Sequence, residues 1–299
     1  MKQRVNNTEG CLNTYPSHLR RRRYPVVLSI AGSDSSGGAG IQADIKTLSA
    51  LGVYGATAIT AITAQNTCGV HAQMAVPAQM VYDQIIAVVE DVSPSVVKIG
   101  MLANVDVVCA VAEALMRYSI PIILDPVMVS SSGHRLLAIE AQEAVIKHLL
   151  PMSMLITPNI PEMAALTSMP LSSDTEKMAA ASHLMARGAR AILLKGGHEE
   201  GATKSDILYR HTAEGIVTTT FTSPTIATRN VHGTGCTLSS AIAAFVARGY
   251  GLVEAVDAAK RYVYEAIEAG ADVAIGGGFG PVNHLFDPQP MQIYEERTL

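Results

Sequence analysis

The stretch VVLSIAGSDSSGGAGIQAD, residues 26–44, contains a strand, a loop and the start of a helix in direct succession. Its first part, Val26–Ile30, is an apolar run rich in β-branched residues, which is typical of a buried strand. The segment that follows the loop has apolar residues at helical spacing, namely Ile41, Ile45, Leu48 and Leu51. The glycines and serines between strand and helix predict a tight loop whose backbone amides converge on a ligand. A strand, a loop and a helix in this order predict a βαβ unit.

The same order of elements recurs along most of the chain. Further apolar runs predict strands at Ala58–Thr63, Val96–Ile99, Ile120–Leu124, Met154–Thr157 and Ala191–Leu194. Helical patterns occupy residues 104–118, 138–149 and 174–187, and two long helices, Thr234–Arg248 and Leu252–Ala271, close the pattern. This alternation predicts an α/β fold with a mostly parallel sheet and helices on both faces. Period-two alternation in Asp206–Tyr209 and Gly215–Phe221, about a turn at His211–Glu214, predicts one antiparallel hairpin.

The composition excludes several classes of protein. Of the 299 residues, 48% are hydrophobic and 16% are charged, a balance that excludes intrinsic disorder of the main body. No apolar run reaches the roughly 18–20 residues of a membrane-spanning helix, which excludes an integral membrane protein. The four cysteines form no CxxC pair, which argues against a disulfide scaffold or zinc site and favours the cytoplasm; they are Cys11, Cys68, Cys109 and Cys236.

Charge is unevenly distributed between the N-terminus and the rest of the chain. Residues 1–25 carry six basic side chains and one acidic side chain, whereas the remainder is acidic and brings the net charge to −4. An acidic body argues against a nucleic-acid partner. Arginines fill positions 20–23 before a short apolar stretch, and we interpret 1–25 as a flexible basic leader rather than a targeting signal. Residues 26–299 contain no repeat or linker, which predicts a single domain.

The loop at residues 32–40 lacks the glycine spacing of the common nucleotide-binding loops. Neither the GxGxxG of a dinucleotide fold nor the GxxxxGK[ST] of a P-loop occurs here, which argues against an NAD-dependent oxidoreductase. The loop predicts a small polar ligand at a helix N-terminus, and a tight turn without a ligand is the alternative. Asp44 falls close to the first turn of this helix, so it is either a capping charge or a ligand-binding residue.

A second glycine-rich loop, His-Gly-Thr-Gly-Cys-Thr at 232–237, precedes another helix. Gly233 and Gly235 flank Thr234 where this helix begins, so unpaired N–H groups are expected to point outward from its positive end. Such a turn binds anions and stabilises the charge that develops on a phosphoryl group during transfer. Cys236 lies in the same turn, where the helix dipole predicts a lowered thiol pKa and a thiolate.

These two loops resemble the two signatures of the hydroxymethylpyrimidine/phosphomethylpyrimidine kinases, which are thiamine-biosynthesis enzymes with the ribokinase-like fold. The matching segments are GSDSSGGAGIQAD at 32–44 and HGTGCT at 232–237. Shorter segments that are also similar to the family are TAQNT at 63–67, KIGML at 98–102, LDPVM at 124–128, TPNIPE at 157–162 and LKGGH at 194–198. The resemblance runs from about Val26 to Gly280 in the family's order, and it implies the ribokinase-like fold.

The resemblance implies that ATP phosphorylates 4-amino-5-hydroxymethyl-2-methylpyrimidine, and that the monophosphate is then phosphorylated to the diphosphate. Family positions for binding the pyrimidine fall on Gln65, Asp44, Met101, Val127 and Gly32. A glutamine carboxamide suits the edge of an aminopyrimidine because it accepts one hydrogen bond and donates two in a single plane.

The catalytic positions of the family fall on Gly233, Thr234, Gly235 and Cys236. The three residues before the cysteine form the anion-binding turn, and Cys236 stands where sugar kinases of the broader family carry an aspartate base.

The resemblance also implies ATP as phosphoryl donor together with Mg²⁺. Asn159, Lys195 and Thr234 match ATP-binding positions, and a strand-end lysine that only extends its ammonium to water is the alternative for Lys195. Glu162 and Asp125 are the expected metal-side carboxylates, acting through water. By analogy with the family, we expect a homodimer and small-molecule partners only.

Two other functions remain open on this scaffold. A pyridoxine/pyridoxal kinase shares the fold and a ring alcohol as acceptor, so that activity, or dual activity, is an alternative. Gln65 favours the pyrimidine because pyridoxal lacks an aminopyrimidine edge. A non-catalytic vitamin-binding protein is the second alternative, although Gly233, Gly235, Cys236 and Glu162 are all present.

Overall fold

The computed structural model describes residues 22–129, 133, 136–197 and 201–295. Most of the expected leader, residues 1–21, lies outside the described residues, and so does the last residue, 198, of the LKGGH segment. The described end of the leader is strand β1 (Arg22–Arg23), which pairs antiparallel with β12 (Tyr294–Glu295) near the other end of the chain.

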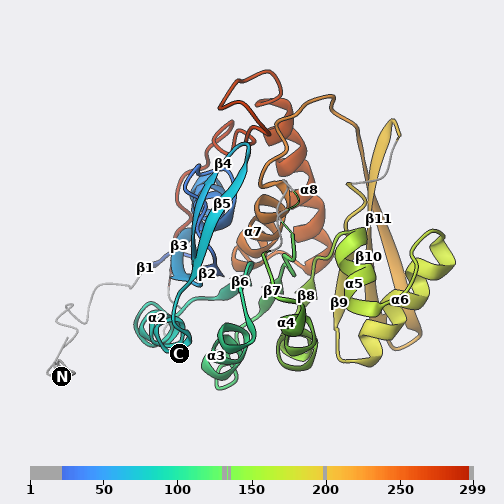
Figure 1. Cartoon of the computed structure of the whole chain (residues 1–299), viewed down its shortest axis with the longest axis horizontal. Coiled ribbons are helices and arrows are strands. Elements are labelled where there is room, and N and C mark those ends of the chain that lie inside the picture. Colours follow the sequence, from blue (N-terminus) through green and yellow to red (C-terminus); the bar gives the residue numbers. More distant parts are fainter. Residues whose placement is uncertain (1–21, 130–132, 134–135, 198–200, 296–299) are drawn as a thin grey trace, which may run out of the picture.

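An eight-stranded sheet forms the centre of the molecule (Figure 1). Its order is β11-β10-β9-β8-β7-β6-β2-β3. The strands are β2 (Val26–Ala31), β3 (Tyr54–Ile59), β6 (Val96–Ile99), β7 (Ile122–Leu124), β8 (Leu155–Ile156), β9 (Ala191–Leu194), β10 (Thr203–Thr212) and β11 (Gly215–Pro224). Neighbours from β3 to β9 pair in parallel, whereas β9, β10 and β11 pair antiparallel. The predicted α/β class, the mostly parallel sheet and the late hairpin are therefore confirmed.

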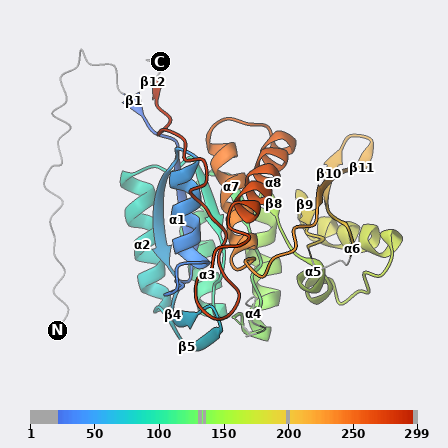
Figure 2. The ribbon, with the colours of Figure 1, turned by 90° about the horizontal axis from the view of Figure 1, so that it is seen from above.

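Helices cover both faces of the sheet (Figure 2). One face carries α1 (Gly40–Ala50), α7 (Thr234–Ala247) and α8 (Leu252–Glu268), which share an apolar core with the sheet. The other face carries α2 (Ala78–Asp91), α3 (Val105–Leu115), α4 (Ile139–Ala144), α5 (Ile160–Thr167) and α6 (Asp174–Ala186) over a second core. Among the described residues, no helix is both long enough and apolar enough to cross a membrane.

The prediction of one strand at Ala58–Thr63 was wrong. The chain leaves the main sheet at Thr60 and divides into β3 and β4 (Ala61–Asn66). The β4 strand pairs with β5 (Gly69–Ala75) in a separate two-stranded hairpin. The hydrophobic pattern runs through this break without interruption, because Thr60 at the turn is at least as buried as its apolar neighbours. What marks the turn is a hydrogen bond from the Thr60 N–H to the carbonyl oxygen of Ala31, which is remote in sequence. Gln65 consequently lies within a strand of this hairpin and not after a strand of the central sheet.

Other sequence-based boundaries differ by smaller amounts. The expected helix at 138–149 is α4, followed by a π-helical turn (Val145–Leu149) and a 3-10 turn (Leu150–Met152). Pro151 lies at this point, and proline has no N–H with which to continue regular helical hydrogen bonding. Helices α2 and α5 and strand β5 were not predicted, whereas the two last helices were.

The segment after α8 returns across α7 and is held there by a buried histidine. The imidazole Nε2 of His284 lies 3.0 Å from the Thr237 hydroxyl in the first turn of α7. The carbonyl oxygen of His284 accepts a hydrogen bond of 2.7 Å from Tyr262 of α8. Burial lowers the pKa of His284 to about 4, and the positive charge of Lys46 acts in the same direction. The folded chain therefore holds this histidine neutral.

His284 is expected to make stability fall in mild acid. Its pKa in the folded chain is about 4, below the ordinary value of 6.5. Between pH 6.5 and pH 4 the unfolded chain therefore binds a proton at this histidine and the folded chain does not, which favours unfolding. This group alone is expected to remove about 2 kcal/mol of unfolding free energy between about pH 7 and pH 5. Urea unfolding of His284→Gln at both values should show a smaller loss than the wild type. The exposed His211→Gln variant is the control, and equal losses in His284→Gln and wild type would contradict the assignment.

Candidate active site

The carboxyl ends of five parallel strands meet at one edge of the sheet, and each is followed by a polar residue or glycine. Gly32 follows β2 and Asp125 follows β7 directly, whereas Met101 comes two residues after β6. Asn159 and Lys195 follow β8 and β9 and form an isolated parallel bridge with each other. In open α/β sheets, this edge is where ligands bind. A cleft of about 810 Å³ opens here between the sheet edge, the β4–β5 hairpin and the start of α7.

The cleft brings together nearly all of the residues singled out from the sequence. Those that line it are Gly32, Gln65, Met101, Asp125, Val127, Asn159, Glu162, Lys195, Gly233, Thr234, Gly235 and Cys236. Gln65 and the turn at Gly233–Cys236 therefore share one cleft, although β4 and α7 are far apart in the sequence. Asp44 is the exception and does not line the cleft.

The first turn of α7 is shaped by close contact with the loop after β2. Gly233 is the N-cap residue and has a left-handed φ of 79°. A Cβ atom at this position would overlap the carbonyl oxygen of Gly38, so only glycine fits. No described side chain caps the helix start. The residues of this turn line the cleft at the positive end of a 14-residue helix, which is a favourable position for an anion, although the Thr234 N–H already donates to the Val231 carbonyl at 3.3 Å.

The predicted lowering of the Cys236 pKa was wrong. Burial raises the pKa of this thiol to about 11, against an ordinary value of 9.0. The positive charge of Lys98 and a hydrogen bond from the Gly40 backbone act in the opposite direction, while Asp44 and Asp125 add to the increase. The sequence pattern reveals the helix dipole but not the loss of water or the two carboxylates, which outweigh the dipole here.

A compact cluster of charges lies opposite the turn. The ammonium group of Lys195 is 2.8 Å from Asp125 Oδ1 and 3.7 Å from Glu162 Oε2. Burial alone would raise the pKa of Asp125, but Lys195 and Lys98 hold it below the usual range. Burial raises the pKa of Glu162 to about 7, and Asp125 contributes in the same direction. Lys195, despite burial, has its pKa raised by these two carboxylates, so it is a fixed cation and not a solvated surface lysine.

Asn159 and Glu162 also have a structural role at the start of α5. The Asn159 side chain accepts from the Glu162 N–H, and Glu162 Oε2 accepts from the Asn159 N–H, each at 2.8 Å. This reciprocal pair is a capping box, and it holds both side chains at the cleft wall. The TPNIPE sequence thus fixes a rigid corner at the end of β8.

Asp44 lies beneath the cleft floor in a buried ion pair. Its side chain and that of Lys98 are both 0% exposed, and the Lys98 ammonium is 2.8 and 2.9 Å from the two carboxylate oxygens. Ser29 and Ser240 also donate to this carboxylate, at 2.6 and 2.7 Å. Asp44 is neither a capping charge nor a residue facing the cleft, because it lies in the second turn of α1 with both oxygens occupied.

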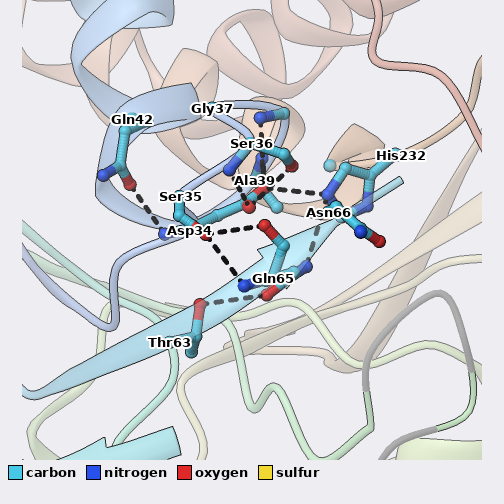
Figure 3. A network of polar contacts seen from close by, with 12 residues as sticks. Asp34, Ser35, Ser36, Gly37, Ala39, Gln42, Thr63, Gln65, Asn66 and His232 are labelled. Carbon is cyan, nitrogen blue, oxygen red and sulfur yellow. Dashed lines mark hydrogen bonds and ion pairs between the residues drawn. The ribbon is translucent and has the colours of Figure 1, made fainter. Parts of the chain in front are cut away.

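Sequence reasoning missed two residues that connect the glycine-rich loops, although both occur in the quoted motifs. Asp34 Oδ2 lies 2.8 Å from His232 Nε2, and both residues line the cleft although their side chains are largely buried. The same imidazole nitrogen lies 3.4 Å from the Gln65 carboxamide (Figure 3). A sequence pattern indicates loops of this kind, but it does not show which side chains meet between them.

A second ion pair that the sequence did not reveal lines the far part of the cleft. Lys260 of α8 lies 2.8 Å from Asp206 Oδ2 of β10, and Asp206 Oδ1 accepts from the Gly196 N–H at 2.9 Å. This pair ties the last helix to the antiparallel edge of the sheet and places a cation beside the loop that follows β9.

Comparison with known proteins identifies the family to which the chain is similar. The family model described as phosphomethylpyrimidine kinase matches residues 34–283. A Rhizobium meliloti protein named hydroxymethylpyrimidine/phosphomethylpyrimidine kinase is 49% identical over 261 residues, which cover 87% of this chain and 97% of the relative.

Two solved structures show how far the architecture is shared. The crystal structure of phosphomethylpyrimidine kinase from Clostridium difficile is 42% identical with a TM-score of 0.71, and the match covers 81% of this chain and 99% of that one. The Staphylococcus aureus pyridoxal kinase in complex with AMP-PCP and pyridoxal is 29% identical with a TM-score of 0.79, covering 92% and 100%. The fold is therefore common to a phosphomethylpyrimidine kinase and a pyridoxal kinase.

Loss of Lys98 is expected to destabilise the protein strongly, because it leaves the Asp44 charge buried without its cation. We expect Lys98→Met to lower the unfolding free energy by about 3–5 kcal/mol in urea titrations. The double variant Lys98→Met/Asp44→Asn should recover at least about 1 kcal/mol of this loss, since no buried charge remains.

The exposed Arg261–Asp257 pair provides a matched control for this experiment. Arg261→Met should change stability by no more than about 1 kcal/mol. A loss of that small size in Lys98→Met would show that the buried pair is not needed. A double variant less stable than the single one would show that the unpaired Asp44 charge does not cause the loss.

Proposed function

The chain belongs to the phosphomethylpyrimidine kinase family, and we propose that it catalyses two ATP-dependent phosphorylations in thiamine biosynthesis. The first acceptor is the primary alcohol of 4-amino-5-hydroxymethyl-2-methylpyrimidine, and the second is the resulting monophosphate. The observation that carries this proposal is the shared cleft, in which a carboxamide suited to an aminopyrimidine lies across from an anion-binding turn.

The substrate ring is proposed to bind between Gln65 and Met101. The Met101 thioether is buried next to Gly32, and a Cβ atom at Gly32 would be 2.8 Å from the Met101 sulfur, so the glycine leaves room for this side chain. Met101 and Val127 then provide an apolar surface for the ring face. Gln65 provides the polar edge, accepting from the exocyclic amine and donating to the adjacent ring nitrogen.

Phosphoryl transfer is assigned to the turn at Gly233–Cys236. Its N–H groups would bind the transferring phosphoryl group and stabilise the charge that it develops. The substrate hydroxyl oxygen attacks the γ-phosphorus, the bond to the ADP oxygen breaks, and the hydroxyl proton passes to Cys236 in its thiolate form. Because the thiol pKa is about 11, only a small fraction of the free protein carries this base at neutral pH.

ATP is proposed to bind along Asn159, Lys195 and Thr234, with Lys195 as the phosphate-facing cation. Among the described residues, no group of three or more His, Cys, Asp or Glu side chains is arranged as a complete metal site. Two cleft carboxylates, Asp125 and Glu162, fit the way Mg²⁺ usually accompanies a nucleotide, held by one or two carboxylates, waters and the phosphates themselves. Their oxygens already accept from Lys195, Thr157, Ser239 and Asn159, which favours contact through water. Bound there, Mg²⁺ would neutralise phosphate charge during transfer.

Pyridoxal phosphorylation is the second candidate function, because the likeness to the Staphylococcus aureus pyridoxal kinase extends over 92% of the chain. Pyridoxal carries a similar primary alcohol but no amino group on the ring. Binding it would leave the acceptor of Gln65 without a partner, and a site built around a hydrogen bond rejects such a substrate. We therefore propose the pyrimidine as the preferred acceptor.

A kinetic comparison of the two alcohols tests this function. With ATP and Mg²⁺, we expect ADP release with a higher kcat/KM for the pyrimidine alcohol than for pyridoxal, and sequential formation of mono- and diphosphate products by chromatography. Gln65→Leu should raise the KM for the pyrimidine by about tenfold or more, because it loses hydrogen bonds to the substrate. The exposed Gln73→Leu on β5 is the matched control. Faster use of pyridoxal would overturn the choice of substrate, and no ADP release with either alcohol would indicate a binding protein.

Replacing Cys236 tests its role as the base. We expect Cys236→Ala to bind ATP with a Kd close to that of the wild type but to turn over at least about tenfold more slowly. Because the thiolate fraction increases with pH below a pKa of about 11, the wild-type rate should rise from about pH 7 to pH 9. That rise should be absent in Cys236→Ala. An unchanged rate, or the same pH profile in both proteins, would remove the base assignment.

A further inference from the structure

Three side chains from separate parts of the chain meet at His232, beside the cleft. Asp34 lies in the loop after β2, His232 is the residue before the N-cap of α7, and Gln65 lies in β4 (Figure 3). Asp34 is 2% exposed and His232 is 5% exposed, so water does not compete strongly for their contacts. The His232 Nε2 atom is the common partner, 2.8 Å from Asp34 Oδ2 and 3.4 Å from the Gln65 amide.

Asp34 is a carboxylate that can only accept hydrogen bonds. Its Oδ2 accepts from the backbone N–H groups of Gly38 and Ala39, at 3.1 and 2.8 Å, and its Oδ1 accepts from the N–H and hydroxyl of Ser36. Burial opposes its ionisation, but the hydrogen bonds from His232 and Ser36 hold the pKa of Asp34 well below its usual range. The short contact to His232 Nε2 therefore requires a proton on that nitrogen, which fixes the tautomer of the imidazole.

A protonated His232 Nε2 determines how the Gln65 amide must face. A carboxamide NH₂ group directed at this N–H would place two donors against each other. The opposite end of the side chain lies 3.3 Å from Thr63 Oγ1, whose own proton is donated to the Ser33 carbonyl at 2.8 Å. Thr63 Oγ1 can consequently accept from Gln65. No donor opposes another donor when the Gln65 carbonyl oxygen faces the His232 N–H, which Asp34 holds by the shorter contact, and the Gln65 NH₂ group faces Thr63.

We propose that His232, held by Asp34, is a positioning residue that locks the Gln65 carboxamide in one orientation and so selects a ring with an amino group next to a ring nitrogen. The proposal rests on the proposed function. In this orientation, Gln65 keeps one N–H and one lone pair of its oxygen free for the substrate. The oxygen requires a donor, which an aminopyrimidine provides, and it repels a second acceptor.

The same arrangement connects substrate recognition to the anion-binding turn. His232 immediately precedes Gly233, and its backbone N–H bonds to the Gly280 carbonyl at 3.0 Å, which anchors the residue from the other side. A Cβ atom at Gly38 would overlap the imidazole, so the two glycine-rich loops are in contact at this point. The group that orients Gln65 is thus one residue from the turn assigned to phosphoryl transfer.

Kinetic selectivity tests the proposal. In His232→Ala, the Gln65 amide is free to rotate, so we expect the ratio of kcat/KM for the pyrimidine alcohol over pyridoxal to fall by about tenfold or more. The change should appear mainly in the KM for the pyrimidine, with the KM for ATP within about twofold of wild type. His232→Gln, which retains an N–H donor for Asp34, should restore part of the ratio. The exposed His211→Ala is the matched control. A ratio unchanged in His232→Ala would overturn the proposal.

The tautomer can be measured without any substitution. In ¹⁵N NMR spectra of the labelled wild-type protein, His232 is expected to carry its proton on Nε2, and a proton on Nδ1 alone would overturn the proposal even if His232→Ala failed to fold. This measurement also separates the two hypotheses. If the wild type phosphorylates neither alcohol, the proposed function fails while the spectrum still tests the geometry. If it is active but the tautomer is wrong, only the positioning role fails.

Discussion

The carboxylate of Asp34 is the contact on which the cleft depends, because it joins two loops that lie about 200 residues apart in the sequence. It accepts from its own loop at Ser36, Gly38 and Ala39, and from His232 at the start of the other loop. Four hydrogen bonds and an imidazole in a buried site over-determine the position of one side chain. This fixed point explains why glycine is needed at Gly38 and Gly233, where the loops come into contact and any Cβ atom would collide. The substrate side and the phosphate side of the cleft are consequently held in a constant relation.

Two lysines determine the electrostatics on the other side of the cleft. Lys98 lies beneath the floor with Asp44, and Lys195 lies at the wall with Asp125 and Glu162. Both cations are held by carboxylates, so the wall has little excess positive charge before a nucleotide binds. The burial that makes these pairs strong also acts on Cys236, whose thiol remains protonated in the free protein. If Cys236 is the base, the burial that would exclude water from the proposed reaction also keeps its thiol protonated, so one substitution in the wall would change both properties.

The architecture could be predicted from the sequence because the composition of a parallel sheet's carboxyl edge can be inferred from the order of apolar runs and polar residues. Apolar runs mark strands, their carboxyl ends share one edge, and polar residues directly after them must meet. This reasoning located Asp125, Asn159 and Lys195 correctly. It failed where the decisive partner is remote in sequence. The break at Thr60 depends on a hydrogen bond to Ala31, and the burial of Asp44 depends on Lys98 and Ser240. The state of Cys236 depends on how much water reaches the thiol, which no local pattern records.

Substrate choice on this scaffold must come from a few side chains, because the architecture is shared by kinases of a pyrimidine and of a pyridine alcohol. Both alcohols offer a flat ring and a primary hydroxyl group, so under the proposed function the apolar wall of Met101 and Val127 and the turn at Gly233–Cys236 would serve either one. The difference between the rings is the arrangement of donors and acceptors along one edge. A glutamine that can rotate matches either arrangement, whereas a glutamine held by its neighbours matches one. Under the proposed function, specificity would therefore depend less on the presence of Gln65 than on the contacts with His232 and Thr63 that restrain it.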